Sequence, residues 1–286
     1  MAKKDKDAAI DVMTIERGLI EVCVLGTSGI ILNRMSEKAR RQLLMPPGRK
    51  SSAERASSLK HNPMEEYRSA PYVSRDGTAP TYLQGLAVWF KKAMSSCALD
   101  IPGTAKAQMD RLLWAEGERI ALYGVPQMFM SVVRSADMNR TPDIRTRPIL
   151  PKWACRVSIS YTKPILREQV VANLFAAAGF MRGVGDWRAE KGSAQYGCFK
   201  MVNADDPEFL SIIESGGRQA QLQAMQAPAY YDEETEELYE WFLREVVKKG
   251  YKLTDLDTSL AELEATGRVH SPKNGHDPEP LPAVLD

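Results

Sequence analysis

The alternation of hydrophobic and polar positions in residues 18–202 changes repeatedly between the period of a strand and that of a helix. Runs with strand character lie at 18–32, 118–123, 127–134, 153–161 and 196–202. Apolar residues at helical spacing lie at 82–98, 104–114 and 165–178. Apart from insertions, the order strand, helix, strand, strand, helix, strand predicts an α+β fold with a ferredoxin-like (RRM-like) βαββαβ core. Helices would cover one face of its antiparallel sheet and leave the other face free.

Polar insertions and a helical C-terminal region accompany this core. The insertions span 46–80 and 134–152, and we interpret the second as an exposed loop or a projecting hairpin. Helices are predicted at 207–215 and 233–249, the latter with an acidic first turn. The predicted organisation is an N-terminal arm at 1–17, the core at 18–202, an acidic helical region at 203–265 and a disordered tail at 266–286.

Charge is distributed unevenly along the chain, although the formal net charge is +1. Residues 203–286 contain 18 acidic and 7 basic side chains, a net charge of −11, whereas residues 1–202 contain 31 basic and 19 acidic side chains, a net charge of +12. A basic body followed by an acidic third suggests a surface that binds a polyanion. Charge balance between two packed regions would give the same pattern, and the sequence leaves this alternative open.

Basic stretches coincide with the insertions. The first runs from Lys38 to Lys60, and the second, around Pro142 and Pro148, has no helical period. Guanidinium groups match the geometry of phosphates and stack on bases, so we predict that these stretches contact a nucleic-acid backbone. The candidate binding residues are Arg40, Arg41, Arg49, Lys50, Lys60, His61, Arg134, Arg140, Arg145 and Arg147. The alternative is a pair of solvated loops with incidental arginines.

A glycine-rich loop at 179–197 is the most specific segment of the chain, and its Gly179 is expected to end the preceding helix. Glycines allow backbone N–H groups to approach phosphates, cations supply charge, and aromatic rings offer a stacking surface. The candidate residues are Arg182, Gly183, Gly185, Trp187, Arg188, Lys191 and Tyr196. Neither a Walker A motif nor a dinucleotide fingerprint is present. A tight turn that needs glycine for positive φ is the alternative explanation.

With this loop between the second helix and the last strand of the predicted core, the chain resembles the RAMP superfamily of CRISPR-associated proteins over about residues 18–202. The resemblance implies a ferredoxin-like core whose glycine-rich loop holds RNA, as in the backbone subunits of Cascade-like complexes. It also implies that one insertion, 46–80 or 134–152, reaches across the bound strand. The loop departs from the tandem-glycine GGR form of many RAMP proteins. The string GVGDWR at 183–188 is also similar to tailed-phage proteins, which implies a phage-encoded relative in the host cytoplasm.

Catalytic and metal-binding patterns are missing from the sequence, and we predict no catalytic residue, no metal site and no cofactor. The histidines His61, His270 and His276 form no HExxH or paired Cys/His spacing, and no GxSxG occurs. The RAMP resemblance implies one alternative, an endoribonuclease in which His61 is the general base for a ribose hydroxyl. Four widely separated cysteines indicate reduced thiols, and no apolar run is long enough for a membrane span. We therefore expect a cytoplasmic protein without a membrane partner.

The sequence thus predicts a non-catalytic protein that binds single-stranded RNA or DNA and self-associates into a homo-oligomer or filament along the strand. In the filament, the acidic C-terminal region of one copy would face the basic body of the next. Besides the RNA-cleaving protein, a structural or assembly protein of a phage particle is the remaining alternative.

Overall fold

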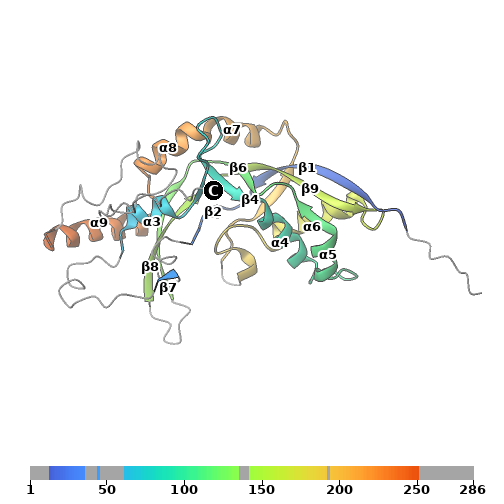
Figure 1. Ribbon diagram of the computed structural model, residues 1–286. Helices are drawn as coiled ribbons and strands as arrows, with labels where there is room; N and C mark the ends of the chain where they lie inside the picture. The colour runs from blue at the N-terminus through green and yellow to red at the C-terminus, as the bar shows by residue number, and fades with distance from the viewer. Residues whose placement is uncertain (1–12, 36–43, 46–60, 135–141, 192–193, 251–286) are drawn as a thin grey trace, which may run out of the picture.

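A computed structural model describes residues 13–35, 44–45, 61–134, 142–191 and 194–250 of the chain (Figure 1). Within these ranges, antiparallel strands form a larger and a smaller sheet, and helices pack on both faces of the larger one. The larger sheet corresponds to the predicted core, whereas the smaller sheet contains much of the second predicted insertion.

The larger sheet has the strand order of a ferredoxin-like core. Its strands are β1 (Glu16–Gly26), β3 (Tyr72–Val73), β4 (Leu83–Leu86), β5 (Leu113–Ala115), β6 (Arg119–Tyr123), β9 (Ala154–Lys163) and β10 (Phe199–Val202). In the order β10-β1-β9-β6, the fourth core strand, β10, lies beside the first, β1. The third core strand, β9, lies between β1 and the second, β6, and all pairs are antiparallel. This order is that of the split βαβ motif, so the predicted ferredoxin-like α+β fold is confirmed.

Two helices cover one face of this sheet. They are α4 (Ala87–Cys97) and α6 (Glu168–Met181), and α5 (Lys106–Leu112) follows α4 in the chain. Alternate residues of β9 face the helices, because Val157 is buried in the main core cluster whereas Arg156 is exposed on the opposite face. The hydrophobic core therefore lies between the sheet and the helix pair, as the two-residue period of the strand predicts.

The smaller sheet contains β2 (Ile30–Ile31), β7 (Gln127–Arg134) and β8 (Pro142–Leu150). β7 and β8 pair in antiparallel register, so the second insertion is the projecting hairpin that its composition indicated. We call the described residues of 127–150 the hairpin. The first insertion contains an element of its own, since α3 (Pro63–Ser69) packs against β8.

The second face of the larger sheet is partly covered, so the prediction of a free face is wrong at one end. There, Phe209 of α7 (Pro207–Ser215) packs against Leu25 of β1 and Ala154 of β9. Figure 1 shows α7 above the sheet, with α4 and α6 below it. The apolar side chains of α7 and of the strand ends remove each other from water, which is the physical reason for this layer.

The acidic helical region packs on the core through two further helices. Met225 of α8 (Arg218–Gln226) belongs to the main core cluster. Thr235 of α9 (Glu233–Lys248) accepts a hydrogen bond from the amide of Met130 in β7 at 3.1 Å. The C-terminal helices therefore stabilise both sheets, and the exposed face of α9 carries most of its acidic residues.

The predicted helix at 82–98 begins later than expected, because residues 83–86 form β4. The amides of Tyr82 and Leu83 both donate to the side-chain oxygen of Gln221 at 2.8 Å, and β4 pairs with β6. A short apolar run is buried equally well as strand or helix, so its spacing alone did not distinguish the two. Similarly, the helix predicted at 104–114 covers only 106–112, and Trp114 lies in β5.

The strand run at 18–32 is interrupted at residues 26–29, as the glycines at both ends of this segment indicate, and Ile30–Ile31 pairs with β8 in the smaller sheet. One helix end was misplaced in the sequence prediction. Gly179 lies inside α6, which continues to Met181. A Cβ at Gly179 would lie 2.3 Å from the carbonyl oxygen of Phe199, so this glycine allows α6 to approach β10 closely.

The four cysteines are free thiols in the structure, and two of them, Cys97 and Cys155, are buried. Burial raises the pKa of both thiols. None of the helices in the described ranges combines the length and the apolar character that a membrane span requires.

Candidate nucleic-acid interface

The glycine-rich loop lies on the turn that connects β1 to β2. The amide of Asp186 donates to the carbonyl of Ile31 at 2.9 Å, and the amide of Gly197 donates to that of Gly29 at 2.7 Å. Its glycines with positive φ are Gly183 (66°), Gly185 (84°) and Gly197 (73°). Conformation and close packing therefore account for glycine at these positions, as the tight-turn alternative proposes. Phosphate binding by the loop stays a prediction.

The described cations of the loop are paired with carboxylates of the same chain. Arg182 forms an ion pair with Asp100, and the Nε of Arg188 donates to Glu190 at 2.7 Å. Burial opposes ionisation of Glu190, but hydrogen bonds, including the one from Arg188, hold its pKa below the ordinary value. Lys191 ends a short 3-10 helix, and its side chain lies outside the described atoms. Arg182 and Arg188 thus stabilise the loop.

Two aromatic residues of the loop, Trp187 and Tyr196, pack on the hairpin. Their rings surround Phe129 of β7, with centroid distances of 5.8 Å from Trp187 and 6.0 Å from Tyr196. Both side chains are partly buried in this cluster, which Tyr231 completes from the C-terminal region. Trp187 has a φ of 50°, a conformation that costs free energy in a non-glycine residue. It is tolerated here because the ring packs against those of Phe129 and Tyr196.

Arg147 joins the hairpin to the loop. Its side chain is almost buried, and its Nη1 lies 2.5 Å from Oδ2 of Asp186. The guanidinium carbon is 5.5 Å from the centroid of the Trp187 ring, and Asn33 donates to the same Asp186 oxygen at 3.0 Å. A buried charge needs such a partner, so Arg147 positions β8 on the loop and does not present its guanidinium to solvent.

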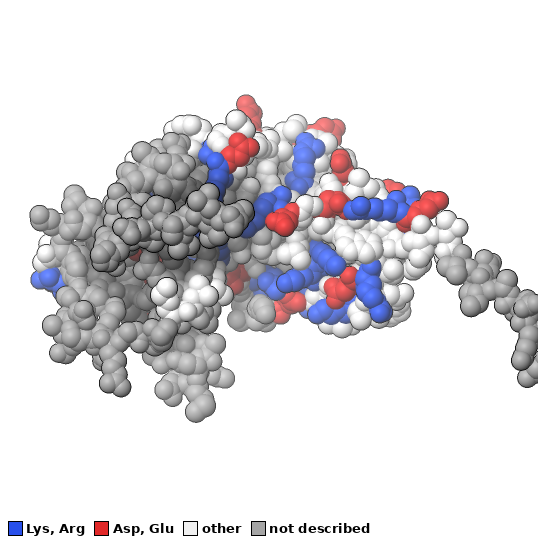
Figure 2. Space-filling view, in the orientation of Figure 1, with Lys and Arg blue, Asp and Glu red and all other residues white. Residues whose placement is uncertain are grey.

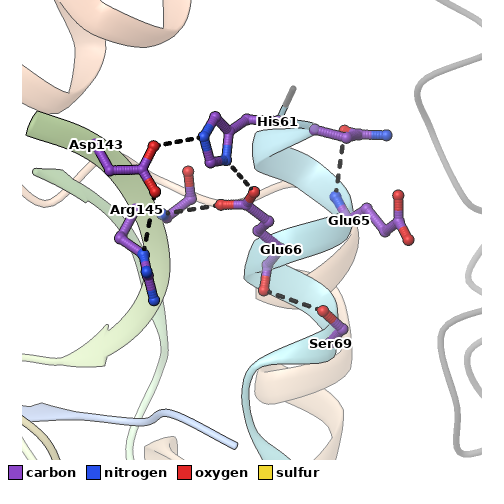
Figure 3. A network of polar contacts seen from close by, with 8 residues as sticks. His61, Glu65, Glu66, Ser69, Asp143 and Arg145 are labelled. Atoms are coloured by element: carbon purple, nitrogen blue, oxygen red, sulfur yellow. Dashed lines mark hydrogen bonds and ion pairs between the residues drawn. The ribbon is translucent and has the colours of Figure 1, made fainter. Parts of the chain in front are cut away.

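A polar network joins the hairpin to α3 (Figure 3). His61 Nδ1 lies 2.6 Å from Oε1 of Glu66, and His61 Nε2 lies 2.9 Å from Oδ1 of Asp143. The second oxygen of Glu66 accepts a hydrogen bond from the amide of Thr146 at 3.3 Å. Arg145 Nε is 3.7 Å from the second oxygen of Asp143, and the Arg145 side chain is 47% exposed. Arg145 is therefore a guanidinium that the hairpin presents to solvent.

The same contacts argue against His61 as a general base. A carboxylate oxygen lies against each ring nitrogen, an arrangement that favours the imidazolium, in which both nitrogens donate. The hydrogen bond to Glu66 raises the pKa of His61 above its ordinary 6.5; burial opposes this effect and Asp143 reinforces it. A base must offer a nitrogen lone pair to the substrate, and neither nitrogen is available for that purpose.

Part of the predicted site lies outside the described residues. These candidates are Arg40, Arg41, Arg49, Lys50, Lys60 and Arg140. Arg134 is the last residue of β7 and pairs with Pro142 at the end of the hairpin where the chain passes from β7 to β8, although its side chain is not described. The structure nevertheless places both the loop and His61, the residue that follows the first basic stretch, against the hairpin.

Sequence reasoning identified Asp143 as an acidic residue within the second basic stretch, but it missed the other carboxylates that pair with candidate cations. They are Glu66, Asp100, Asp186 and Glu190. Asp186 and Glu190 lie within the loop sequence, so their pairing with loop or hairpin cations could have been predicted. Asp100 is distant in the sequence, and only the fold brings it to Arg182. In the view of Figure 2, basic and acidic side chains of the described residues alternate without forming a continuous basic patch. Within the described ranges, no group of His, Cys, Asp and Glu is arranged to hold a metal ion.

Comparisons with known proteins give similarity to solved structures. Protein-family models and curated proteins yield no match. Among solved structures, the chain is similar to a chain in the cryo-EM structure of the Type III-B Cmr-beta bound to cognate target RNA. The identity is 13% and the TM-score 0.35, over 65% of this chain and 59% of that chain. The chain therefore spans less than two thirds of that neighbour's length, and the similarity concerns the fold alone.

Proposed function

We propose that this chain is a non-catalytic protein that binds single-stranded RNA or DNA along the hairpin and the adjoining glycine-rich loop. The main supporting observation is the convergence of three separately predicted segments. The Arg147–Asp186 ion pair joins the hairpin to the loop, and the His61–Asp143 contact joins the hairpin to the residue that follows the first basic stretch. The described parts of these segments thus lie beside one another, and cations on neighbouring segments would bind several phosphates of a polyanion at once.

The residues of this surface would have different roles. The hairpin cations Arg134, Arg140 and Arg145 would contact phosphates, because arginine forks bind phosphate oxygens in pairs. Arg147, Arg182 and Arg188 bind carboxylates of the chain and would hold the surface in shape. The exposed edges of the Trp187 and Tyr196 rings would be offered to bases. The cations between residues 40 and 60 would extend the surface beyond the described residues.

We further propose that copies assemble side by side on one strand. The exposed face of α9 carries acidic residues that would contact the basic body of the next copy. They are Glu233, Glu234, Glu236, Glu237 and Glu240. Such a head-to-tail contact generates a filament unless its rotation closes a ring. The phage origin and the cytoplasmic location stay predictions.

Substituting Arg145 tests the hairpin. We expect Arg145→Ala to weaken binding to a single strand of about 30 nucleotides by about threefold to tenfold at low salt, because one phosphate contact is lost. The slope of log affinity against log salt should fall in magnitude by about 0.7. Fluorescence anisotropy with end-labelled RNA and DNA at several salt concentrations measures both quantities.

Lys152→Ala is the matched control. Lys152 is 77% exposed, lies beyond the other end of β8 and has Glu208 as a distant partner at 3.8 Å. Loss of the Lys152 ammonium also lowers the net charge by one, so a general charge effect would weaken strand binding equally in both variants. Equal affinities of the two variants would remove the hairpin from the binding site, and cleavage of the labelled RNA would contradict a non-catalytic protein.

A further inference from the structure

His61 controls the charge of the network beside Arg145. Its two ring nitrogens contact carboxylates on different elements, Glu66 on α3 and Asp143 on β8. With the proton on the ring, the formal charge of the three groups is −1; without it, the charge is −2 and one carboxylate faces a nitrogen lone pair. The position of β8 on α3 and the local field at Arg145 therefore depend on the same proton.

Among the described residues, the two carboxylates that contact His61 are Glu66 on α3 and Asp143 on β8. The other charged residues of these two elements are Glu65, Arg68, Arg145 and Arg147. Arg68 is buried and donates to the carbonyls of Met225 and Gln226 at 2.9 Å in both cases. Arg147 is paired with Asp186. The α8 helix thus presents backbone carbonyl oxygens to Arg68 on α3.

We propose that His61 is a positioning residue of the binding surface, whose imidazolium holds β8 against α3 and offsets the two carboxylates beside Arg145. This inference rests on the proposed function. Loss of the proton would remove one of the two hydrogen bonds of the ring, to Glu66 or to Asp143, and a positive charge close to the guanidinium that would contact phosphate. The affinity for a polyanionic strand would then fall as the pH rises.

The direction follows from the pKa shift. Hydrogen bonding to Glu66 raises the pKa of His61 above 6.5, so the contribution of the imidazolium is complete below about pH 6.5. It is lost as the pH rises through the folded-state pKa. An unpaired surface histidine would instead lose its charge around its ordinary pKa.

The protonation state can be read directly by nitrogen NMR of the full chain. The sequence contains three histidines, so His61→Gln identifies the imidazole signals of His61 by their disappearance. We expect a pH titration to show that both ring nitrogens of His61 stay protonated to a higher pH than those of an ordinary histidine. A His61 ring that loses its proton at or below its ordinary pKa would overturn the proposal, and this measurement does not require nucleic acid.

The effect on binding is measured by titrating a labelled single strand between pH 5.5 and pH 8.5 at fixed salt. The wild type should lose affinity by about threefold to tenfold across this range, whereas His61→Gln, which retains His270 and His276, should bind weakly at every pH. Parallel profiles of the two proteins would overturn the role in binding. If the wild type binds no strand at any pH, the proposed function fails; a protonated His61 would then still support its role in holding β8 against α3.

Discussion

Replacing Gly197 with alanine should lower the free energy of unfolding by about 3 to 5 kcal/mol. Gly197 has a φ of 73°, and a Cβ there would lie 1.7 Å from the carbonyl oxygen of Val184. The amide of Val184 donates to the carbonyl of Gly197 at 2.9 Å, so both backbones are fixed. The loop would have to move off the β1–β2 turn to accept the methyl group. Urea unfolding followed by circular dichroism measures the loss.

Gly103→Ala is the control that separates the cost of a positive φ from the cost of a close backbone contact. Gly103 has a similar φ of 80°, but a Cβ there would meet no atom within 4 Å. We expect it to cost about 1 kcal/mol, the strain of a left-handed alanine alone. Equal losses for the two variants would show that the loop is not packed closely at Gly197.

Replacing Gln221 with leucine should cost at least about 3 kcal/mol of unfolding free energy, because buried backbone groups lose their partners. The Gln221 side chain is fully buried and lies within hydrogen-bonding distance of five backbone groups. Its oxygen accepts from the amides of Tyr82 and Leu83, and its two N–H groups are shared among three carbonyls, those of Leu122, Gly124 and Gly216. Leucine has a similar volume but cannot replace any of these bonds.

The matched variant is Gln223→Leu on the same helix. Gln223 is exposed, so the substitution should change the free energy of unfolding by no more than about 0.5 kcal/mol. A similarly small effect at Gln221 would contradict the interpretation that α8 holds β4, β6 and α7 together.

The order of the core elements could be predicted from the sequence because long strands and helices have distinct hydrophobic periods. β9 shows this most clearly, since its buried Val157 and exposed Arg156 follow the two-residue period. Residues 83–86 could not be assigned, because their strand conformation depends on Gln221, which lies far away in the sequence. The partial covering of the second face of the larger sheet likewise depends on α7, which packs on strand residues that are distant from it in the sequence.

The sequence predicted which segments form the candidate surface, but not which of their side chains are exposed, buried or paired. Composition identified the loop and the hairpin, and the fold places them in contact through Phe129 and Trp187. Composition did not show that Arg147 is buried or that Arg182 is paired with Asp100, because such pairs form between residues distant in the sequence. Of the hairpin arginines with described side chains, Arg145 is the one that faces solvent, which makes it the most informative position.

The central claim, that the chain binds single strands through phosphate contacts, is tested most directly by the salt dependence of wild-type binding to RNA and DNA strands of two lengths. The predicted result is an affinity that falls steeply with salt, by a log–log slope of about −0.7 for each phosphate contacted, with a steeper isotherm on the longer strand where copies assemble. An affinity that does not change with salt, or no binding to either strand at low salt, would contradict it.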